Sequence, residues 1–476
     1  MTNEIAEYGM IGLGTMGRNL LYNMNDKGYS VAGFDKNKSQ VELLKKEGKD
    51  KTIFATADLS EFVKSLKTPR VIILLVPAGK IVDDVIAELK PLLSKDDLIM
   101  DCGNSHYIDT DKRIKELAKS NLQFMGVGVS GGEYGARNGP SIMPGGAKEV
   151  YARVQKMLAS ISAKVNNEPC VTWLGPGSAG HYVKMVHNGI EYGLMQLIAE
   201  SYHLLKVLGN LDNDELHTVF SKWNNDKLHS YLIQITADIF TQKDDLTSAY
   251  LVDMILDSAH QKGTGAWTSE DAMKIQVPVP VIDSAVSTRD LSAYKKEREA
   301  AAKKLGEPYL PEDDKYEKED IIYLVEEALY FSMIITYAQG MVLLQAASKE
   351  YEYDLKLQRI ASIWRGGCII RASLLEEIHT AFSNQPNLPN LLMDDEFSKK
   401  LVIMQNSIRE LIQISVRNGV PVPAFMSSLT YFDGYRSAWL PANLLQAQRD
   451  YFGAHTYERI DRAGTFHTNW NQTKDE

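Results

Sequence analysis

The sequence predicts an α/β N-terminal domain built on a parallel sheet, then a large all-α domain and a C-terminal tail. Three observations support this prediction. The length of 476 residues is too great for one compact core. Short apolar runs alternate with helical stretches over about the first third of the chain. After the boundary-like cluster Gly175-Pro176-Gly177, long helical segments follow with almost no strand signals.

The first domain is expected to span residues 1–177. Its expected strands cover residues 8–12, 29–34, 70–76, 98–100 and 122–129, and helical stretches include 17–27 and 81–93. Strands that alternate with helices predict a parallel sheet covered by helices on both faces.

The second domain is expected to span residues 178–440 and the tail residues 441–476. Expected helices cover residues 181–208, 246–259, 319–349, 357–380 and 396–418, while the charged stretch 294–316 suggests a solvated helix and a surface loop. Residues 328–347 carry no formal charge and are long enough to span a bilayer. Because polar residues such as Gln339 interrupt this stretch and no second apolar span accompanies it, a buried helix is the better interpretation.

Composition narrows the class of protein. The chain has 52 basic and 62 acidic residues, a formal charge of −10, which disfavours non-specific binding to nucleic acid. Its three cysteines, Cys102, Cys170 and Cys368, have no metal-like spacing and fit a reducing compartment. The N-terminus lacks a signal-peptide pattern. We therefore expect a cytoplasmic protein without a metal site or a membrane partner.

A phosphate-binding loop follows the first expected strand. Gly12-Leu13-Gly14-Thr15-Met16-Gly17 is a GxGxxG motif placed between a strand and a helix. Gly12 permits the tight turn, Gly14 lets a pyrophosphate approach the backbone, and Gly17 allows close packing of strand and helix. The helix N-terminus offers free N–H groups to the phosphates. The motif indicates a Rossmann-type dinucleotide site, and a plain strand-to-helix turn is the alternative.

The second strand ends in Asp35-Lys36-Asn37. A carboxylate 23 residues after Gly12 can accept hydrogen bonds from the ribose 2′-hydroxyl of NAD and repel the 2′-phosphate of NADP. Lys36 favours the opposite preference, because a cation can pair with that phosphate. A merely solvated Asp35 is the alternative interpretation.

One helix carries a polar stripe. Lys184, His187, Asn188 and Glu191 are spaced i, i+3, i+4 and i+7, so their side chains share one helical face. A Lys/Glu stripe is usually a solvated face. Here the neighbouring residues are apolar, so the stripe is predicted to be largely buried, where burial and proximity can tune both pKa values for acid–base chemistry.

Further polar, glycine-rich segments could form an anion site. Gly126 to Gly132 and Gly103-Asn104-Ser105 follow expected strands, whose carboxyl ends bind ligands in such sheets. Gln261-Lys262-Gly263-Thr264-Gly265 places a lysine in a turn of small residues. Arg289 lies in a polar segment and is uninformative by itself.

Together these segments resemble the 6-phosphogluconate dehydrogenase family, from Gly12 to about Tyr457. The resemblance is carried by residues 103–105, 128–133, 180–192, 261–265 and 443–455 in this order. It implies oxidative decarboxylation of 6-phospho-D-gluconate to D-ribulose 5-phosphate and CO2 with reduction of NAD(P)+. It also implies a homodimer in which the tail reaches the partner subunit.

The resemblance assigns roles to individual residues. Lys184 would be the general base and Glu191 the general acid. The expected cofactor-binding residues are Gly12, Leu13, Gly14, Thr15, Met16, Gly17, Asp35, Lys36, Asn37, Val76, Pro77, Ala78 and Asn104. The expected substrate-binding residues are Asn104, Ser130, Gly131, Gly132, His187, Asn188, Tyr192, Lys262, Arg289, Arg449 and His455, the last two from the other subunit's tail.

The sequence departs from the family pattern at three places, and the first two bear on the cofactor. Asp35-Lys36-Asn37 replaces the usual Asn-Arg-Ser or Asn-Arg-Thr, and Val76-Pro77-Ala78 replaces Val-Lys-Ala. Ala266 replaces the usual lysine after Gly-Thr-Gly. The family favours NADP, whereas Asp35 and Pro77 favour NAD. Two other functions stay open: a related β-hydroxyacid dehydrogenase acting on a small unphosphorylated acid, and a catalytically silent dinucleotide-binding sensor.

Overall fold

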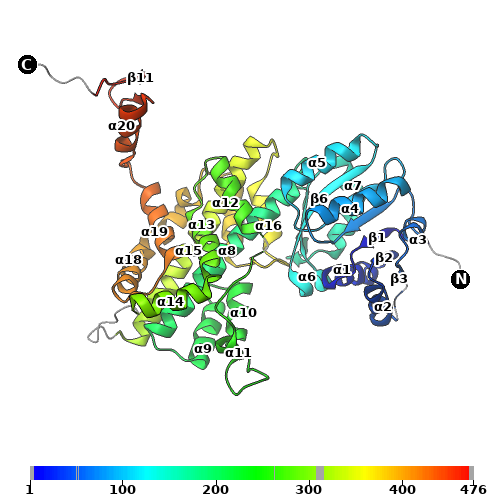
Figure 1. Ribbon diagram of the computed structural model, residues 1–476, viewed down its shortest axis with the longest axis horizontal. Helices are drawn as coiled ribbons and strands as arrows, with labels where there is room; N and C mark the ends of the chain where they lie inside the picture. The colour runs from blue at the N-terminus through cyan, green and yellow to red at the C-terminus, as the bar shows by residue number, and fades with distance from the viewer. Residues whose placement is uncertain (1–4, 50, 52, 262, 307–315, 471–476) are drawn as a thin grey trace, which may run out of the picture. The chain divides into compact units, whose positions relative to one another are not determined.

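The N-terminal part of the computed structural model is a seven-stranded sheet (Figure 1). The structure describes residues 5–49, 51, 53–261, 263–306 and 316–470. The strands are β1 (Tyr8–Ile11), β2 (Val31–Phe34), β3 (Ile53–Thr56), β4 (Val71–Leu74), β5 (Leu98–Asp101), β6 (Gln123–Ser130) and β7 (Ser141–Pro144), in the order β3-β2-β1-β4-β5-β6-β7. All neighbours pair in parallel except β6 and β7. The sequence pattern had not indicated β3 or the antiparallel β7.

Helices cover both faces of this sheet, as the alternation of strands and helices predicts. The helices are α1 (Thr15–Asp26), α2 (Lys38–Glu47), α3 (Leu59–Lys64), α4 (Lys80–Leu89), α5 (Tyr107–Ala118), α6 (Gly132–Asn138) and α7 (Lys148–Ile161), with a 3-10 turn over Lys90–Leu92. Apolar residues of α1, α2 and α7 form one core against the sheet, and those of α3, α4 and α5 form the other. A two-residue pairing of β8 (Lys164–Val165) and β9 (Glu168–Pro169) precedes the helical part.

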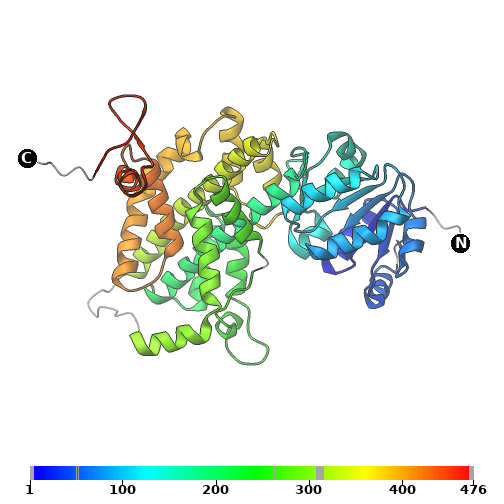
Figure 2. The ribbon, with the colours of Figure 1, turned by 45° about the horizontal axis from the view of Figure 1, so that its top comes forward.

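The helical part is arranged around two long helices, α8 (Ala179–Val207) and α15 (Lys318–Glu350), which lie side by side in Figures 1 and 2. Its elements are α8 (Ala179–Val207), α9 (Asn213–Asn224), α10 (Tyr231–Ile239), α11 (Leu251–Met254), α12 (Thr264–Lys274), α13 (Pro280–Ser292), α14 (Lys295–Leu305), α15 (Lys318–Glu350), α16 (Leu357–Trp364), α17 (Leu374–Asn384), the 3-10 turn Leu391–Met393, α18 (Asp395–Arg417) and α19 (Pro423–Tyr435). Small residues let α8 and α15 approach, since a Cβ at Gly340 would stand 2.4 Å from Cδ1 of Ile190. This packing buries the first half of α8 almost completely.

Two of the expected helices are wrong. Within residues 246–259 only Leu251–Met254 is helical. The Asp244 side chain accepts from the Leu246 N–H and the Thr247 hydroxyl accepts from the Ala249 N–H, so local side-chain bonds replace the helical ones.

The second wrong helix is 357–380, which is interrupted between α16 and α17. Gly367 has a φ of +70°, a backbone conformation outside the right-handed helix. The interruption forms a loop, residues 365–373, that enters the candidate site described below.

The uncharged stretch 328–347 lies in α15 and is buried, as expected. Among the described residues, α15 is the one helix long and apolar enough to cross a membrane, and 78% of its most apolar window is buried inside the structure. Its apolar surface is therefore used in the core of the helical part.

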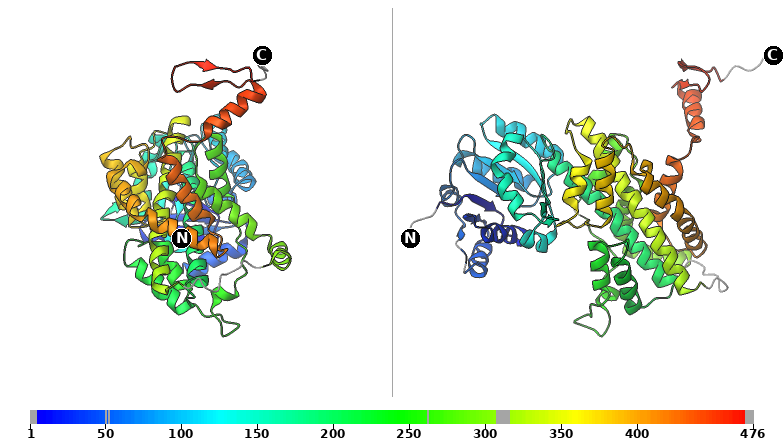
Figure 3. Two further views of the ribbon diagram at one scale, coloured as in Figure 1. Left: turned by 90° about the vertical axis from the view of Figure 1, so that its left-hand side faces the viewer. Right: turned by 180° about the vertical axis from the view of Figure 1, so that it is seen from behind.

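The chain divides into two compact units, Met1–Ser428 and Leu429–Glu476. The second unit contains the end of α19, then α20 (Ala442–Gly453) and a short hairpin of β10 (Tyr457–Glu458) and β11 (Thr465–Phe466), seen in Figure 3. The expected domain boundaries at residues 177 and 440 stay a prediction.

Candidate active site

The polar stripe of α8 lies on a buried helix rather than on a solvated face. Lys184, His187 and Asn188 are all buried, with 6%, 0% and 7% of their surface exposed. Glu191, one turn further along, keeps 22% of its side chain exposed. Two ionisable side chains, Lys184 and Glu191, are thus held in the interior with one end of the stripe open to ligand or solvent.

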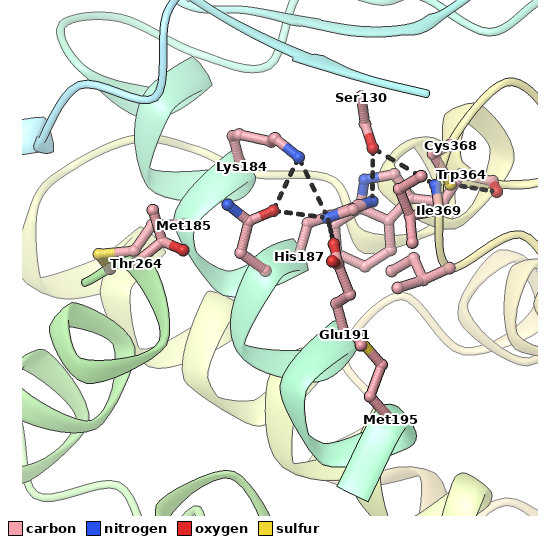
Figure 4. A network of polar contacts seen from close by, with 12 residues as sticks. Ser130, Lys184, Met185, His187, Glu191, Met195, Thr264, Trp364, Cys368 and Ile369 are labelled. Carbon is pink, nitrogen blue, oxygen red and sulfur yellow. Dashed lines mark hydrogen bonds and ion pairs between the residues drawn. The ribbon is translucent and has the colours of Figure 1, made fainter. Parts of the chain in front are cut away.

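The stripe side chains interact with one another (Figure 4). Lys184 Nζ donates to Asn188 Oδ1 at 2.7 Å and lies 3.5 Å from His187 Nδ1. His187 Nδ1 is 3.1 Å from Asn188 Oδ1 and 3.9 Å from Glu191 Oε2. The candidate base and the candidate acid therefore belong to one polar cluster.

Ser130, at the end of β6, joins this cluster from the sheet. Its hydroxyl lies 3.2 Å from His187 Nε2, and the Ile369 N–H donates to it at 3.4 Å. A hydroxyl that donates to Nε2 favours the tautomer with the proton on Nδ1, which faces the Asn188 oxygen. The sheet and the helical part thus fix the orientation of the imidazole together.

Gly131 and Gly132 follow Ser130 and open α6. Gly131 has a φ of +135°, and a Cβ there would stand 2.3 Å from the Gly367 carbonyl oxygen. Only a glycine at 131 permits this approach of the loop between α16 and α17. No atom lies within 4 Å of a Cβ built at Gly132, so space is open above the turn.

The loop between α16 and α17 contains site residues that the sequence reasoning missed. Besides Ile369, it brings Cys368, whose thiol donates to the Trp364 carbonyl at 3.0 Å. The Trp364 ring meets the His187 ring edge-on at 5.6 Å between centroids. The paired glycines Gly366-Gly367 were the available signal, because two adjacent glycines disfavour an uninterrupted helix.

Burial sets the protonation of the stripe. It lowers the pKa of Lys184, although the Glu191 carboxylate acts to raise it. It raises the pKa of Glu191, against the opposing charges of Lys184 and Arg289. Burial and the Lys184 charge hold the pKa of His187 well below its ordinary value. These directions favour a neutral lysine, a neutral imidazole and a protonated glutamic acid in the same site.

Tyr192 and Arg289 extend the cluster along α8. The Arg289 guanidinium, on α13, stacks over the Tyr192 ring at 3.5 Å from its centroid. A Cβ at Gly265 would stand 2.4 Å from Cδ2 of Tyr192, so the start of α12 lies against the same ring. Lys262 lies outside the described residues. The structure thus brings Tyr192 and Arg289 together beside Glu191.

The GxGxxG motif forms the expected turn between β1 and α1. Gly12 has a φ of +96°, and a Cβ at Gly17 would stand 1.9 Å from the Gly12 carbonyl oxygen. Leu13 lies in this turn, and Thr15 and Met16 are the first two residues of α1. No atom lies within 4 Å of a Cβ built at Gly14. An open space beside a helix N-terminus fits the pyrophosphate of a dinucleotide.

The Asp35 carboxylate supports this loop directly. Its Oδ2 accepts from the Leu13 N–H and its Oδ1 from the Asn37 N–H, both at 2.8 Å. The Asn37 side chain accepts from the Ser39 N–H and caps α2. Lys36 pairs with Glu88 of α4 at 2.6 Å. Lys36, which was expected to favour NADP, is therefore engaged in an exposed ion pair with a neighbouring acid.

Two further expected cofactor segments follow the neighbouring strands. Val76, Pro77 and Ala78 follow β4 after one residue, Leu75. Because β4 pairs with β1, this segment lies beside the glycine loop at the carboxyl edge of the sheet. Asn104 is exposed in the loop after β5. Asp101, fully buried at the end of β5, accepts from the Gly103 N–H and from the Ser105 hydroxyl and shapes that loop. Strand order reverses at β1 and β4, where such sheets bind dinucleotides.

Arg449 and His455 lie in the separate unit Leu429–Glu476. Arg449 is on α20 and His455 follows it in a loop. Their relation to Lys184 stays a prediction.

The described residues contain neither a cluster of metal ligands nor an accessible cysteine. No group of three or more His, Cys, Asp or Glu side chains there is arranged to hold a metal ion. The cysteines are free and buried, and burial raises the pKa of all three thiols, to about 12 for Cys368. Buried thiols with raised pKa values are poor nucleophiles.

Family models match both parts of the chain. Residues 7–175 match the NAD binding domain of 6-phosphogluconate dehydrogenase, and residues 180–470 match the C-terminal domain of 6-phosphogluconate dehydrogenase. Together they extend over almost the whole chain.

Individual relatives match over the full length. A protein of Bacillus subtilis named 6-phosphogluconate dehydrogenase, NADP(+)-dependent, decarboxylating, is 53% identical over 98% of this chain and 99% of its own. A Synechococcus elongatus protein named 6-phosphogluconate dehydrogenase, decarboxylating, is 51% identical over 98% of this chain and 99% of its own. The solved Plasmodium falciparum 6-phosphogluconate dehydrogenase, studied with NADP+ and with 6-phosphogluconate, has a TM-score of 0.94 at 44% identity, covering 98% of this chain and 100% of that one.

Proposed function

Because the chain belongs to the 6-phosphogluconate dehydrogenase family, we propose that it catalyses the oxidative decarboxylation of 6-phospho-D-gluconate to D-ribulose 5-phosphate and CO2, with reduction of NAD(P)+. One observation supports this function most strongly. A lysine and a glutamic acid stand on one buried helical face, in a single polar cluster with Ser130, His187 and Asn188. Neither a silent sensor nor a dehydrogenase of small unphosphorylated acids is favoured by the relatives' names.

The first step is proton removal by Lys184. In its neutral form Lys184 takes the proton from the 3-hydroxyl of the substrate, and the lowered pKa of its amine makes that form accessible. The bound nicotinamide supplies the hydride acceptor. Asn188 and His187 orient the amine through the contacts at 2.7 and 3.5 Å.

Decarboxylation follows from the chemistry of the product of that step. A 3-keto acid loses its carboxylate when charge developing on the carbonyl oxygen is stabilised, and the protonated Lys184 is a donor in position to do so. Its burial strengthens this interaction, since few water molecules compete for the charge. The lysine thus acts as base first and as electrostatic donor second.

Glu191 completes the reaction as the acid. Its raised pKa keeps a proton available, and this proton goes to the carbon of the enediolate left after loss of CO2, which gives the ketone of the product. Ser130, Gly131, Gly132, Asn104, Tyr192, Lys262 and Arg289 are proposed to hold the substrate around these two groups.

We further propose a cytoplasmic homodimer in which the tail of one subunit completes the substrate site of the other. Arg449 and His455 would then bind the substrate across the interface. A guanidinium and an imidazole N–H on a small separate unit suit the capture of a phosphorylated acid, since both can donate hydrogen bonds to phosphate oxygens.

Parallel steady-state kinetics test the proposed function. The purified protein should oxidise 6-phosphogluconate with release of CO2 and should use hydroxyisobutyrate far less well. Higher kcat/KM with hydroxyisobutyrate would favour the β-hydroxyacid dehydrogenase, whereas tight cofactor binding without turnover of either acid would favour a sensor.

A further inference from the structure

The described part of the chain from Asp433 to Trp470, called the tail below, is organised around a carboxylate rather than an apolar core. Between Asp433 and Trp470 the one buried residue is Asp450, which is completely inaccessible to solvent. Large apolar side chains of the same segment, such as Leu445 and Phe452, are exposed instead. Since a buried charge is costly unless it is paired, Asp450 requires partners that justify its position.

Four N–H groups donate hydrogen bonds to the Asp450 carboxylate. Its Oδ1 accepts from the Thr456 N–H at 2.9 Å and from His467 Nδ1 at 2.8 Å. Its Oδ2 accepts from the Thr468 N–H at 3.0 Å and from Trp470 Nε1 at 2.8 Å. One side chain on α20 therefore fixes both the loop that follows the helix and the segment that follows the hairpin.

These contacts also determine the charge of the group. Burial acts to raise the pKa of Asp450, but the hydrogen bonds from His467, Thr468, Trp470 and Thr456 lower it well below the ordinary range. The carboxylate is thus ionised at any pH at which the enzyme would work, and both of its oxygens serve as acceptors.

The loop that Asp450 fixes carries His455. Ala454 and Thr456, on either side of it, have φ angles of 49° and 64°, a conformation that residues other than glycine rarely adopt. The Ala454 N–H bonds to the Asp450 carbonyl at 2.9 Å, and Gln446 Nε2 donates to the Thr456 carbonyl at 2.5 Å. Contacts to α20 therefore hold an otherwise disfavoured backbone on both sides of His455.

The His455 ring itself lies over the end of α20. A Cβ at Gly453 would stand 2.6 Å from His455 Cδ2, and the Phe452 ring meets the imidazole edge-on at 6.0 Å. Arg449 directly precedes Asp450 and donates to Gln446 Oε1 at 3.1 Å. The two candidate phosphate-binding residues are thus positioned by the same turn of helix.

We propose that Asp450 is a positioning residue for substrate binding, which holds Arg449 and His455 in the arrangement that binds the phosphate of the substrate. This inference rests on the proposed function, in which those two side chains belong to the substrate site. Asp450 itself does not touch substrate, because its oxygens are fully used by the tail.

The test compares two Asp→Asn substitutions in the full chain. Asp450→Asn keeps the shape but turns one acceptor into a donor that faces N–H groups, so the loop loosens. The matched control is Asp461→Asn in the same unit, at an exposed carboxylate paired only with neighbouring arginines among the described residues. We expect Asp450→Asn to raise KM for 6-phosphogluconate by about tenfold or more, the usual effect of a misplaced charged hydrogen bond. In Asp450→Asn, kcat and the KM for the cofactor should both stay unchanged. In the Asp461→Asn control, all kinetic constants should stay unchanged.

A second variant protects the test against misfolding. Gly453→Ala leaves Asp450 intact and introduces a methyl group where the His455 ring lies, so it too should raise KM for 6-phosphogluconate without changing kcat. A general loss of structure would instead lower kcat and disturb KM for the cofactor as well. An unchanged KM in Gly453→Ala and in a folded Asp450→Asn would overturn the inference.

Arg449→Ala and His455→Ala separate the two levels of the argument. If both raise KM but Asp450→Asn and Gly453→Ala do not, the positioning role fails and the proposed substrate site survives. If neither raises KM, the tail does not bind substrate, and the positioning role fails with that part of the proposed function.

Discussion

Lys184 shows how one residue takes its chemistry from its surroundings. An exposed lysine is a cation at neutral pH, whereas burial in α8 lowers the pKa of this one. The two contacts to Asn188 and His187 then fix the amine in place. Its candidate role as base depends on both features.

Substitution of Lys184 is the direct test of that role. Lys184→Ala should lower kcat by about 10²- to 10⁴-fold, the usual contribution of a general base. Lys184→Arg should fail similarly, since a guanidinium stays protonated. Cofactor binding, followed by fluorescence titration, should persist in both variants. Near-normal turnover by either one would exclude Lys184 as the base.

The pH dependence of kcat/KM reports the same pair of groups. In the proposed mechanism, activity needs a neutral Lys184, so it should be lost as pH falls through the lysine pKa, which burial has lowered. The proposed mechanism also needs a protonated Glu191, so activity should be lost as pH rises through the glutamate pKa, which burial has raised. We expect a bell-shaped profile in the wild type. The glutamine of Glu191→Gln does not titrate, so this variant should be slower and its profile should rise with pH to a plateau. A bell-shaped profile that persists in Glu191→Gln would assign the loss of activity at high pH to another group.

We propose that Asp35 and Lys36 govern the choice of cofactor. In this proposal the Asp35 carboxylate lies near the ribose of the bound cofactor, and the structure pairs Lys36 with Glu88. We predict that kcat/KM for NAD at least equals that for NADP, because one repulsive contact and two missing cations at about 1 kcal/mol each shift preference by tenfold or more. Asp35→Asn with Lys36→Arg should move the ratio toward NADP.

The control for the cofactor prediction is Glu88→Gln. It releases Lys36 without altering the carboxylate at 35, so it should shift the ratio toward NADP less than the double variant does. A wild-type preference for NADP of a hundredfold would show that Asp35 does not face the 2′ position.

At the scale of elements, one aspartate joins four segments of the first unit. Asp271 of α12 is buried and accepts from the hydroxyls of Tyr107 on α5 at 2.6 Å, Tyr182 on α8 at 2.5 Å and Tyr351 after α15 at 2.7 Å. Because Tyr182 lies two residues before Lys184, the network fixes α8, the helix of the candidate base, against α5 and α12.

Removal of this aspartate should destabilise the whole unit. Asp271→Ala leaves the buried hydroxyls of Tyr107 and Tyr182 and the half-buried hydroxyl of Tyr351 without this acceptor, and it should lower the free energy of unfolding by about 3 kcal/mol. The control, Tyr351→Phe, removes one of the three donors and should cost about 1 kcal/mol. Urea denaturation measures both. An Asp271→Ala variant as stable as the control would mean that the network does not hold the elements together.

At the scale of the whole molecule, a shared active site has a distinctive consequence. In a two-fold dimer, a subunit altered at Lys184 and one altered at Arg449 form a mixed dimer with one intact site. Equal mixing of Lys184→Ala with Arg449→Ala should therefore restore about a quarter of wild-type activity, since half of the dimers are mixed. Each variant alone should be nearly inactive at a substrate concentration near the wild-type KM, far below the raised KM of Arg449→Ala.

Subunit exchange must be verified for this experiment to decide the matter. Exchange can be followed with differently tagged subunits. Truncation before Pro441 is a second experiment, which should raise KM or abolish activity while the N-terminal sheet stays folded. No recovery of activity despite confirmed exchange would argue against a tail shared between subunits.

The sequence by itself determined the features that are encoded locally. The strand, glycine loop and start of α1 follow from residues within one short segment, and the stripe on α8 follows from helical spacing alone. For the same reason the buried nature of α15 was evident from its composition. The helix expected at 246–259 was wrong because side chains there bond to their own backbone, and the helix at 357–380 was wrong because Gly366-Gly367 interrupts it.

Only the tertiary structure decided how these pieces act on one another. Ser130 and Ile369 meet at His187 from positions 239 residues apart, and no local pattern encodes that contact. The pKa directions of Lys184 and Glu191 likewise depend on what packs around α8, since desolvation is a property of the surroundings rather than of the side chain. Asp450 looks like any surface aspartate in the sequence and becomes the centre of the tail only when four donors from distant positions converge on it.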